Sequence, residues 1–267
     1  MNLLQKTITA TAVSSTLLAF TLLAAPALAH PTFLEPEKFN SAVGEQVNLM
    51  LSTSLGYPTM ENGPSLDRIP FIHVMANGQK IENLAFAKKE THMSTSFTAD
   101  NAGFAMAAMS SKRRFGEIKP EEADYYLNAI GVSDEAKAAF FAQEGTPALN
   151  RSFNKHTKTF FCVETCDGGK EAAYVAVGQD LEFVASNEAA NRFVLLLNGA
   201  PVADHAVTVV SPGSDDLELN TNQNGVIDFD TSGMKSVMII SVWVTVPEEA
   251  SGVYQSDYAT LTVNFSN

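Results

Sequence analysis

The last third of the chain repeats one pattern, in which short apolar runs are separated by turns rich in Gly, Asn, Asp and Pro. Closely spaced short strands between such turns are typical of a β-sandwich. We therefore expect residues 179–267 to form a β-sandwich domain. The runs that carry the pattern are LEFVAS, RFVLLLNG, HAVTVVS, GVIDFD, SVMIISVWVTV and YATLTVNF.

Residues 30–178 also indicate β structure. EQVNLMLSTS places Val47, Leu49 and Leu51 on one face of a strand, because side chains alternate along extended backbone. Asn77-Gly78 lies between two apolar runs and is a strong hairpin signal. We expect these residues to form a second, N-terminal β-sandwich domain, with further strands at THMSTSFTA, GFAMAAMSS, KTFFCVE and EAAYVAVG.

A helical pair is expected inside this first domain, at about residues 119–145. Pro120 suits the first turn of a helix, and Gly131 suits its end. Ser133 then suits the N-cap of a second helix that ends at Gly145. The chain as a whole is therefore predicted to be mainly β, with a short two-helix insertion.

Residues 1–29 have the pattern of a secretory signal peptide. Lys6 provides the positive start, an apolar small-residue run follows, and Ala27-Leu28-Ala29 forms a small-x-small cleavage site. The run is shorter than a membrane anchor, and no later segment has the length and apolarity to span a bilayer. We expect cleavage after Ala29, a periplasmic or secreted protein, and no membrane insertion.

The charge balance narrows the classes of partner. The chain has 17 basic and 30 acidic residues and a formal net charge of −13. Binding to nucleic acid or to an anionic membrane requires a basic surface, so this balance argues against both. An acidic surface is compatible with attraction of cations, although solubility alone also explains it.

The two cysteines, Cys162 and Cys166, lie four residues apart in FCVETCDGG. A zinc ribbon needs two such pairs. In an oxidising compartment, one close pair beside a glycine turn indicates a disulfide that closes the turn. A thiolate metal site is the alternative.

Cleavage after Ala29 would give His30 a free α-amine. The amine and the imidazole of a terminal histidine chelate one ion together, and imidazole is a good ligand for copper, nickel and zinc. Pro31 has no N–H, which excludes binding through a deprotonated amide nitrogen of the second residue. The remaining mode is an amine–imidazole brace completed by a second histidine, and the alternative is an ordinary frayed terminus.

The metal ligands that we expect are His30, His73, His92 and His205. His73 shares a strand face with Met75, which suits Cu(I), but it equally suits a hydrogen-bonded histidine on a half-buried strand. His92 is expected to be solvated and available.

Two histidines remain. His156, in NKHTK, is expected to be exposed. His205 starts a strand beside Asp204, whose carboxylate would either orient the ring of a ligand or form an ordinary Asp–His pair.

No sequence motif indicates a catalytic site. The chain has no Gly-x-Ser-x-Gly elbow, no His-Glu-x-x-His helix and no phosphate loop. SPGSDDLELNTNQNGVIDFD is rich in Asp and Asn but lacks the spacing of a calcium loop, so we expect a polar hairpin there. We therefore expect no enzymatic activity.

Six segments carry a family resemblance: AHPTFLEPEKF, VGEQVNLMLSTSLGYP, NKHTKTFFCV, LLLNGAPVADHAVTVV, TNQNGVIDFD and SDYATLTVNF. Together they resemble an exported bacterial family of unknown function described as NikM-like and associated with nickel and cobalt uptake. The C-terminal half is also similar to a transthyretin-like or carboxypeptidase-regulatory-like module. The resemblance implies immunoglobulin-like or transthyretin-like sandwiches and a periplasmic metal-handling role. Members often have a histidine near Trp243 and a small residue at the position of His205, so a family metal site there is lost or rebuilt in this chain.

The leading hypothesis is a non-enzymatic periplasmic protein that binds or delivers nickel, cobalt or copper. Its expected partners are the metal ion and a transporter or receptor component of the envelope. A metal-independent envelope-interaction or glycan-binding module is one alternative. The other is a copper-dependent polysaccharide monooxygenase, because such enzymes also begin with a histidine on a β-sandwich.

Overall fold

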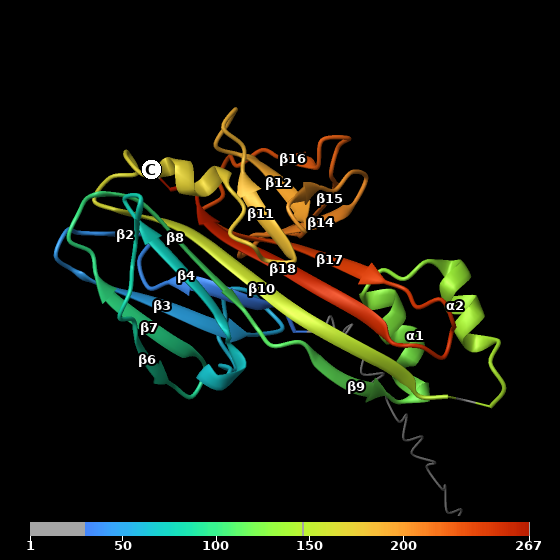
Figure 1. Ribbon diagram of the computed structural model, residues 1–267. Coiled ribbons are helices and arrows are strands. Elements are labelled where there is room, and N and C mark those ends of the chain that lie inside the picture. The colour runs from blue at the N-terminus through green and yellow to red at the C-terminus, as the bar shows by residue number, and fades with distance from the viewer. Residues whose placement is uncertain (1–29, 146, 267) are drawn as a thin grey trace, which may run out of the picture.

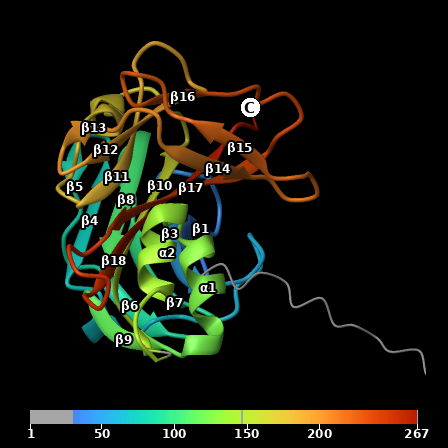
Figure 2. The same cartoon turned by 90° about the vertical axis from the view of Figure 1, so that its right-hand side faces the viewer.

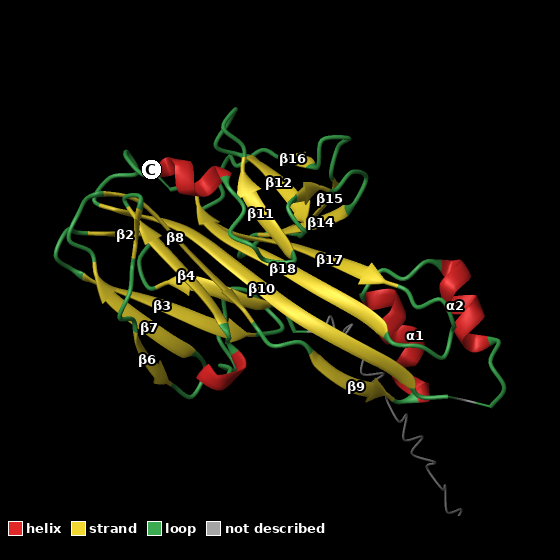
Figure 3. Cartoon of the chain, in the orientation of Figure 1, coloured by secondary structure: helices red, strands yellow, loops and turns green. Residues whose placement is uncertain are grey.

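The structure is a computed structural model that describes residues 30–145 and 147–266. The predicted signal peptide, residues 1–29, and its cleavage site after Ala29 lie outside the described residues. Strands in three sheets are the main regular structure of the described chain, with two short helices at one end (Figures 1 and 3). This confirms the prediction of a mainly β, sandwich-type fold with a two-helix insertion.

A ten-stranded sheet forms the frame of the molecule. Its two longest strands, β10 (Leu149–Val163) and β18 (Tyr254–Asn264), run parallel and side by side across Figure 1. The other strands are β2 (Asn40–Ser41), β4 (Phe71–Ala76), β5 (Gln79–Lys80), β8 (Gly103–Ser110), β9 (Arg114–Ile118), β14 (Ala206–Val210), β15 (Leu217–Asn220) and β17 (Ser236–Thr245). The main path is β15-β14-β17-β18-β10-β8-β4-β5, and β2 and β9 also pair with β10.

A four-stranded sheet packs on one face of this frame. Val47, Leu49 and Leu51 are buried there against Phe161 of β10, as the alternation of the sequence predicts. The first strand of this sheet is also held by β18, because the Thr260 hydroxyl donates to the Thr32 carbonyl at 2.7 Å. The strands, in sheet order, are β1 (Thr32–Pro36), β3 (Gln46–Thr53), β7 (Met93–Thr98) and β6 (Ala85–Lys88).

A second four-stranded sheet packs on the opposite face. Phe183 and Leu195 from this sheet are buried with Phe160 of β10, which points away from its neighbour Phe161 because successive side chains of a strand alternate. The strands are β11 (Leu181–Ala185), β12 (Arg192–Leu197), β13 (Ala200–Pro201) and β16 (Val226–Asp228).

The ten-stranded sheet contains strands from both predicted domains. In β10, from the N-terminal segment, residues Arg151 to Thr159 pair in parallel register with Tyr254 to Thr262 of β18, from the C-terminal segment. Backbone hydrogen bonds therefore join residues 30–178 to residues 179–267. Their independence as domains stays a prediction.

The two helices lie at one end of β10 and β18, and Figure 2 views them from that end. Helix α1 (Pro120–Ala129) starts with proline, and α2 (Asp134–Phe141) is capped by the Ser133 hydroxyl, which accepts from the Ala136 N–H at 3.3 Å. Gly131 between them has a φ of 78°, a conformation that glycine adopts without a steric cost. The start at Pro120, the stop at Gly131 and the cap at Ser133 are therefore those that the sequence predicts. The predicted end at Gly145 is wrong, because α2 ends at Phe141.

Removing the Ser133 cap is expected to destabilise the protein. Ser133→Ala leaves the Ala136 N–H without its acceptor, which costs about 1 kcal/mol for a typical N-cap. Urea denaturation of the variant measures the change. Ser133→Asn keeps a capping acceptor and is the control, and equal stability of the Ala and wild-type proteins would contradict the capping role.

The strand predicted at EAAYVAVG is wrong. Its first part is a short 3-10 helix, η2 (Lys170–Tyr174), and the remainder is not a strand. The N–H groups of Val177 and Gly178 donate to the Glu182 carboxylate at 3.0–3.1 Å instead of to a neighbouring strand. The Glu182 carboxylate therefore accepts the backbone N–H groups that would otherwise pair with a neighbouring strand, and this apolar run does not form a strand.

The polar hairpin predicted in SPGSDDLELNTNQNGVIDFD is also wrong. The segment does contain two strands, β15 and β16, but they lie in different sheets. Val209 of β14 pairs with Leu217 of β15, whereas Val194 of β12 pairs with Val226 of β16. Each of the two strands therefore pairs with a strand outside the segment, β15 with β14 and β16 with β12, and they do not pair with each other.

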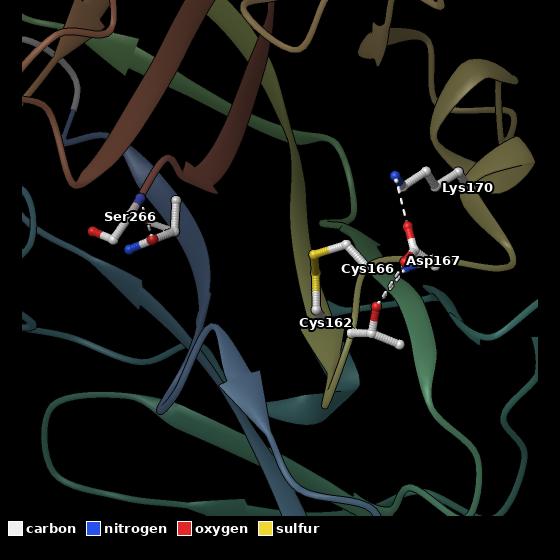
Figure 4. Close-up of a disulfide and its surroundings, with 7 residues drawn as sticks. Cys162, Cys166, Asp167, Lys170 and Ser266 are labelled. Carbon is white, nitrogen blue, oxygen red and sulfur yellow. Dashed lines mark hydrogen bonds and ion pairs between the residues drawn. A yellow bond between two sulfur atoms is a disulfide. The ribbon is translucent and has the colours of Figure 1, made fainter.

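The predicted disulfide between Cys162 and Cys166 is confirmed. Figure 4 shows it at the end of β10, with Cα atoms 5.0 Å apart. Asp167, directly after the bridge, pairs with Lys170 at 3.4 Å. Both sulfur atoms are bonded, so neither is a thiolate ligand in this structure.

Candidate functional site

The structure places His73 in the ten-stranded sheet and His92 directly before a strand of the first four-stranded sheet. His73 is half-buried on β4, where its ring stacks on Phe71 at 6.5 Å, in agreement with the predicted strand face. Burial lowers the pKa of His73, with a smaller contribution from Lys80. His92 precedes β7, and its Nδ1 lies 3.1 Å from the Thr91 hydroxyl.

His205 lies just before β14, with its Nε2 hydrogen-bonded to the Val242 carbonyl at 3.0 Å. Its ring rests on Trp243, with ring centroids 5.2 Å apart. Burial lowers the pKa of His205, and the Val242 carbonyl partly opposes this. The predicted role for Asp204 in orienting the ring is not seen, because that carboxylate accepts from the Gln223 amide at 2.6 Å.

His30 is exposed and precedes β1. Its carbonyl oxygen accepts from the Lys155 ammonium at 2.6 Å, and the next residue, Pro31, accepts from the Ser54 N–H at 3.1 Å. These contacts hold the backbone at this point beside β10. The four predicted ligands thus occupy separate places, and in the part of the chain that the structure describes none of them joins a group of three potential metal ligands. Their role as ligands stays a prediction.

The fifth histidine, His156, is not exposed as predicted. It lies in the middle of β10 and is 3% exposed. Lys158, on the same face of the strand as His156, donates to Glu182 of β11 at 2.6 Å, so this face of NKHTK is covered by the second four-stranded sheet. Lys155 and Thr157 point to the other face. His156 is the histidine around which a group of potential metal ligands forms.

Hydrogen bonds fix the orientation of the His156 ring. Its Nδ1 lies 2.9 Å from the Ser110 hydroxyl, which also accepts from the Gln179 amide at 3.0 Å. Gln179 is itself held by the carbonyl groups of Met109 and Thr157, at 3.1 and 3.3 Å. A ring that donates from Nδ1 to the Ser110 oxygen keeps the lone pair of Nε2 free, which is the arrangement that metal-bound histidines use.

Two carboxylates face the Nε2 atom of His156. Asp257 on β18 lies 3.6 Å from it and Asp180, directly before β11, lies 3.9 Å from it. These distances are too long for hydrogen bonds, and among the described residues Nε2 has no hydrogen-bond partner. All three ligand atoms lie within 4.8 Å of one another. An ion with bonds of about 2.0–2.2 Å separates its ligand atoms by roughly 3–4 Å, and the two distances from Nε2 to the carboxylates, 3.6 and 3.9 Å, fall in this range.

The group of His156, Asp180 and Asp257 is buried on the Asp257 side and open to solvent on the Asp180 side. Asp257 is 11% exposed and pairs with the Arg113 guanidinium, which leaves its other lone pairs available. Asp180 is 54% exposed and gives a route to solvent. One imidazole and two carboxylates form a mixed N/O set that suits divalent transition ions. The Arg113 guanidinium offsets one of the two carboxylate charges.

The sequence pattern gave no signal for this site. Asp180 and Asp257 are far apart along the chain, and they meet because Asn154 pairs with Asp257 in parallel register, which puts Asp257 on the face of His156. His156 was assigned to a solvated segment because its neighbours are Lys and Thr. A run of buried polar residues in one strand has no hydrophobic periodicity to detect.

The chain belongs to the family described as a domain of unknown function, DUF4198, whose model matches residues 27–234. That description assigns no activity, and the finer NikM-like resemblance is not established by it. No curated protein matches the chain.

Among solved structures, the chain aligns with the "D0-D1 domain of Intimin" at 9% identity, covering 85% of this chain and 96% of that one, with a TM-score of 0.21. A TM-score this low does not establish a shared fold. In residues 30–145 and 147–266, no helix is long and apolar enough to cross a membrane.

Proposed function

We propose that the chain is a non-enzymatic, periplasmic metal-binding protein that holds a divalent transition ion at His156, Asp180 and Asp257. The observation that supports this most directly is the buried Nε2 of His156, which has no hydrogen-bond partner in the described chain and faces two carboxylates. A buried polar atom without a partner costs free energy, and a bound ion would remove that cost.

The His156 group also favours a transition ion over calcium or magnesium. Calcium and magnesium take oxygen ligands, whereas imidazole suits nickel, zinc and copper. This agrees with the NikM-like resemblance of the sequence and its association with nickel and cobalt uptake. The proposal therefore extends to a role in binding or delivering nickel or cobalt in the cell envelope.

His30 remains a proposed second metal position. The Lys155–His30 contact holds this residue beside β10, so a free amine created by cleavage after Ala29 would lie at a fixed place rather than on a loose end. An extra residue placed before His30 would weaken binding at this brace and leave binding at His156 unchanged.

Equilibrium dialysis of the processed protein against Ni²⁺, Co²⁺, Zn²⁺ and Cu²⁺ tests the function. We expect at least one of these ions to bind with micromolar or tighter affinity and to raise the melting temperature, because a ligand that prefers the native state stabilises it. Binding no tighter than tens of micromolar for all four ions would refute the proposal and favour a metal-independent envelope module.

Asp180→Asn tests the position of the ion. Because Asp180 is half-exposed and, among the described residues, forms no ion pair other than with His156, the variant is expected to fold and to bind the metal at least tenfold more weakly. Asp215→Asn, in the exposed loop after β14, is the matched control and should bind as the wild type does.

A further inference from the structure

A cavity of about 650 Å³ lies on the other face of β10, toward β1 and β3. It is lined by six cationic side chains, although the chain as a whole carries a formal charge of −13. Among the described residues that line it, Glu61 is the one acidic side chain. The cations are Arg68, Lys112, Arg113, Arg114, Arg151 and Lys155.

The positive charges in this cavity are mostly uncompensated. Arg113 pairs with Asp257, but within residues 30–145 and 147–266 the other five cations form no ion pair. The Nε of Arg151 and one terminal nitrogen of Arg113 are buried without a hydrogen-bond acceptor. Buried guanidinium donors without acceptors indicate that a further acceptor belongs at this place.

The electrostatics of Lys155 show the same excess of positive charge. Burial, with smaller contributions from the neighbouring Arg151 and Arg114, lowers the pKa of Lys155 to about 8. Glu61 lines the same cavity, and the Tyr258 ring lies 5.8 Å from the ammonium. An anion in the cavity would favour the protonated lysine and relieve this repulsion.

Aromatic rings hold two of the guanidinium groups in place. Arg114 lies 5.6 Å and Arg151 4.9 Å from the centre of the Phe153 ring, and Arg151 also lies 5.0 Å from the Tyr126 ring. Stacked guanidinium groups lose less side-chain freedom when a ligand binds. Their planar donors suit carboxylate or phosphate oxygens, which they bind two at a time.

We propose that this cavity binds a small organic polyanion that carries several carboxylate or phosphate groups. Its volume is in the usual range of small-molecule sites, roughly 300–1,000 Å³. Leu51, Ile69 and Met109 add an apolar wall, which favours an organic ligand over a bare inorganic anion. The cavity lies on the opposite face of β10 from His156, because Lys155 and His156 are adjacent in the strand and point to opposite faces. Arg113, which lines the cavity, also pairs with Asp257 of the His156 group, and His30 lies at the cavity wall.

Calorimetric titration of the metal-free protein with citrate and with fructose 1,6-bisphosphate tests the proposal. We expect saturable binding of one molecule per chain for at least one of the two probes, and the better probe identifies carboxylate or phosphate as the preferred group.

Two variants locate the binding site. Lys155→Gln and the exposed Arg114→Gln are each expected to weaken binding at least tenfold, whereas Lys89→Gln, an exposed lysine outside the cavity, is expected to have no effect. Arg114→Gln keeps the test valid if the other variant does not fold. Binding weaker than about 1 mM for both probes, or equal affinity in both cavity variants and the wild type, would overturn the proposal. His156→Gln should retain anion binding, so failure of the metal proposal is distinguishable from failure of this one.

Discussion

His156→Gln is expected to lower the affinity for the divalent ion by at least a hundredfold. The substitution removes the one nitrogen ligand of the group and leaves two carboxylates beside Arg113, a set that binds transition ions poorly. Equilibrium dialysis measures the affinity, and circular dichroism checks that the variant is folded. The effect would be larger than that of Asp180→Asn, because Asp180 is the most exposed of the three ligands.

Separate substitution of the other histidines provides the control. The affinity for the ion is expected to stay within about twofold of the wild-type value in His73→Gln, His92→Gln and His205→Gln, because these three rings lie outside the His156 group. His30→Gln would lower the number of ions bound per chain only if the proposed second position binds an ion. A loss of all binding in His30→Gln together with full binding in His156→Gln would place the ion at the N-terminal brace instead.

Glu182→Gln is expected to destabilise the protein by about 3–5 kcal/mol. Lys158 on β10 and Glu182 on β11 are both almost fully buried, and the ammonium lies 2.6 Å from the carboxylate. The ammonium also donates to the Phe183 carbonyl at 2.8 Å, so the pair links the ten-stranded sheet to the four-stranded sheet that contains β11. Without the carboxylate charge, the buried ammonium lacks its counterion. Urea denaturation measures the free energy of unfolding.

A double-mutant cycle separates the pair from the individual side chains. Lys158→Met in the Glu182→Gln background removes the unpaired charge and is expected to recover at least half of the lost stability, because replacing both members of a buried ion pair costs less than removing one. Asp228→Asn, which breaks the exposed pair with Arg192, is the control and should have a much smaller effect. Additive losses in the double variant would contradict direct coupling.

Much of the fold was predictable because local patterns and tertiary packing agree. Val47, Leu49 and Leu51 alternate in sequence and are all buried on one face. Asn77 and Gly78 both have positive φ, as the hairpin signal requires. Ser133 and Gly131 mark the helix boundaries for reasons that involve only neighbouring residues.

The first half of β10 was not predictable in this way. The sequence indicates a strand only from Lys158, but the strand begins at Leu149. Ser152, Asn154 and His156 are buried, although a strand face of polar residues normally indicates solvent. Their burial depends on β18, whose residues lie just over a hundred positions further along the chain, and on the sheet that contains β11.

The candidate site depends on the same long-range contacts. A terminal histidine is visible in the sequence because its chemistry is local, and this led to His30. Asp180 and Asp257 acquire their relation to His156 only when β11 and β18 take their places beside β10. The basic cavity is hidden for a similar reason, because a strongly negative total charge does not reveal how the few cations are distributed.

Anomalous diffraction from crystals grown with Zn²⁺ tests the central claim most directly. The proposed site predicts an anomalous peak about 2.0–2.2 Å from the Nε2 atom of His156, with Asp180 and Asp257 oxygens at similar distances. A fully bound ion located elsewhere, with no anomalous density between these three side chains, would contradict it.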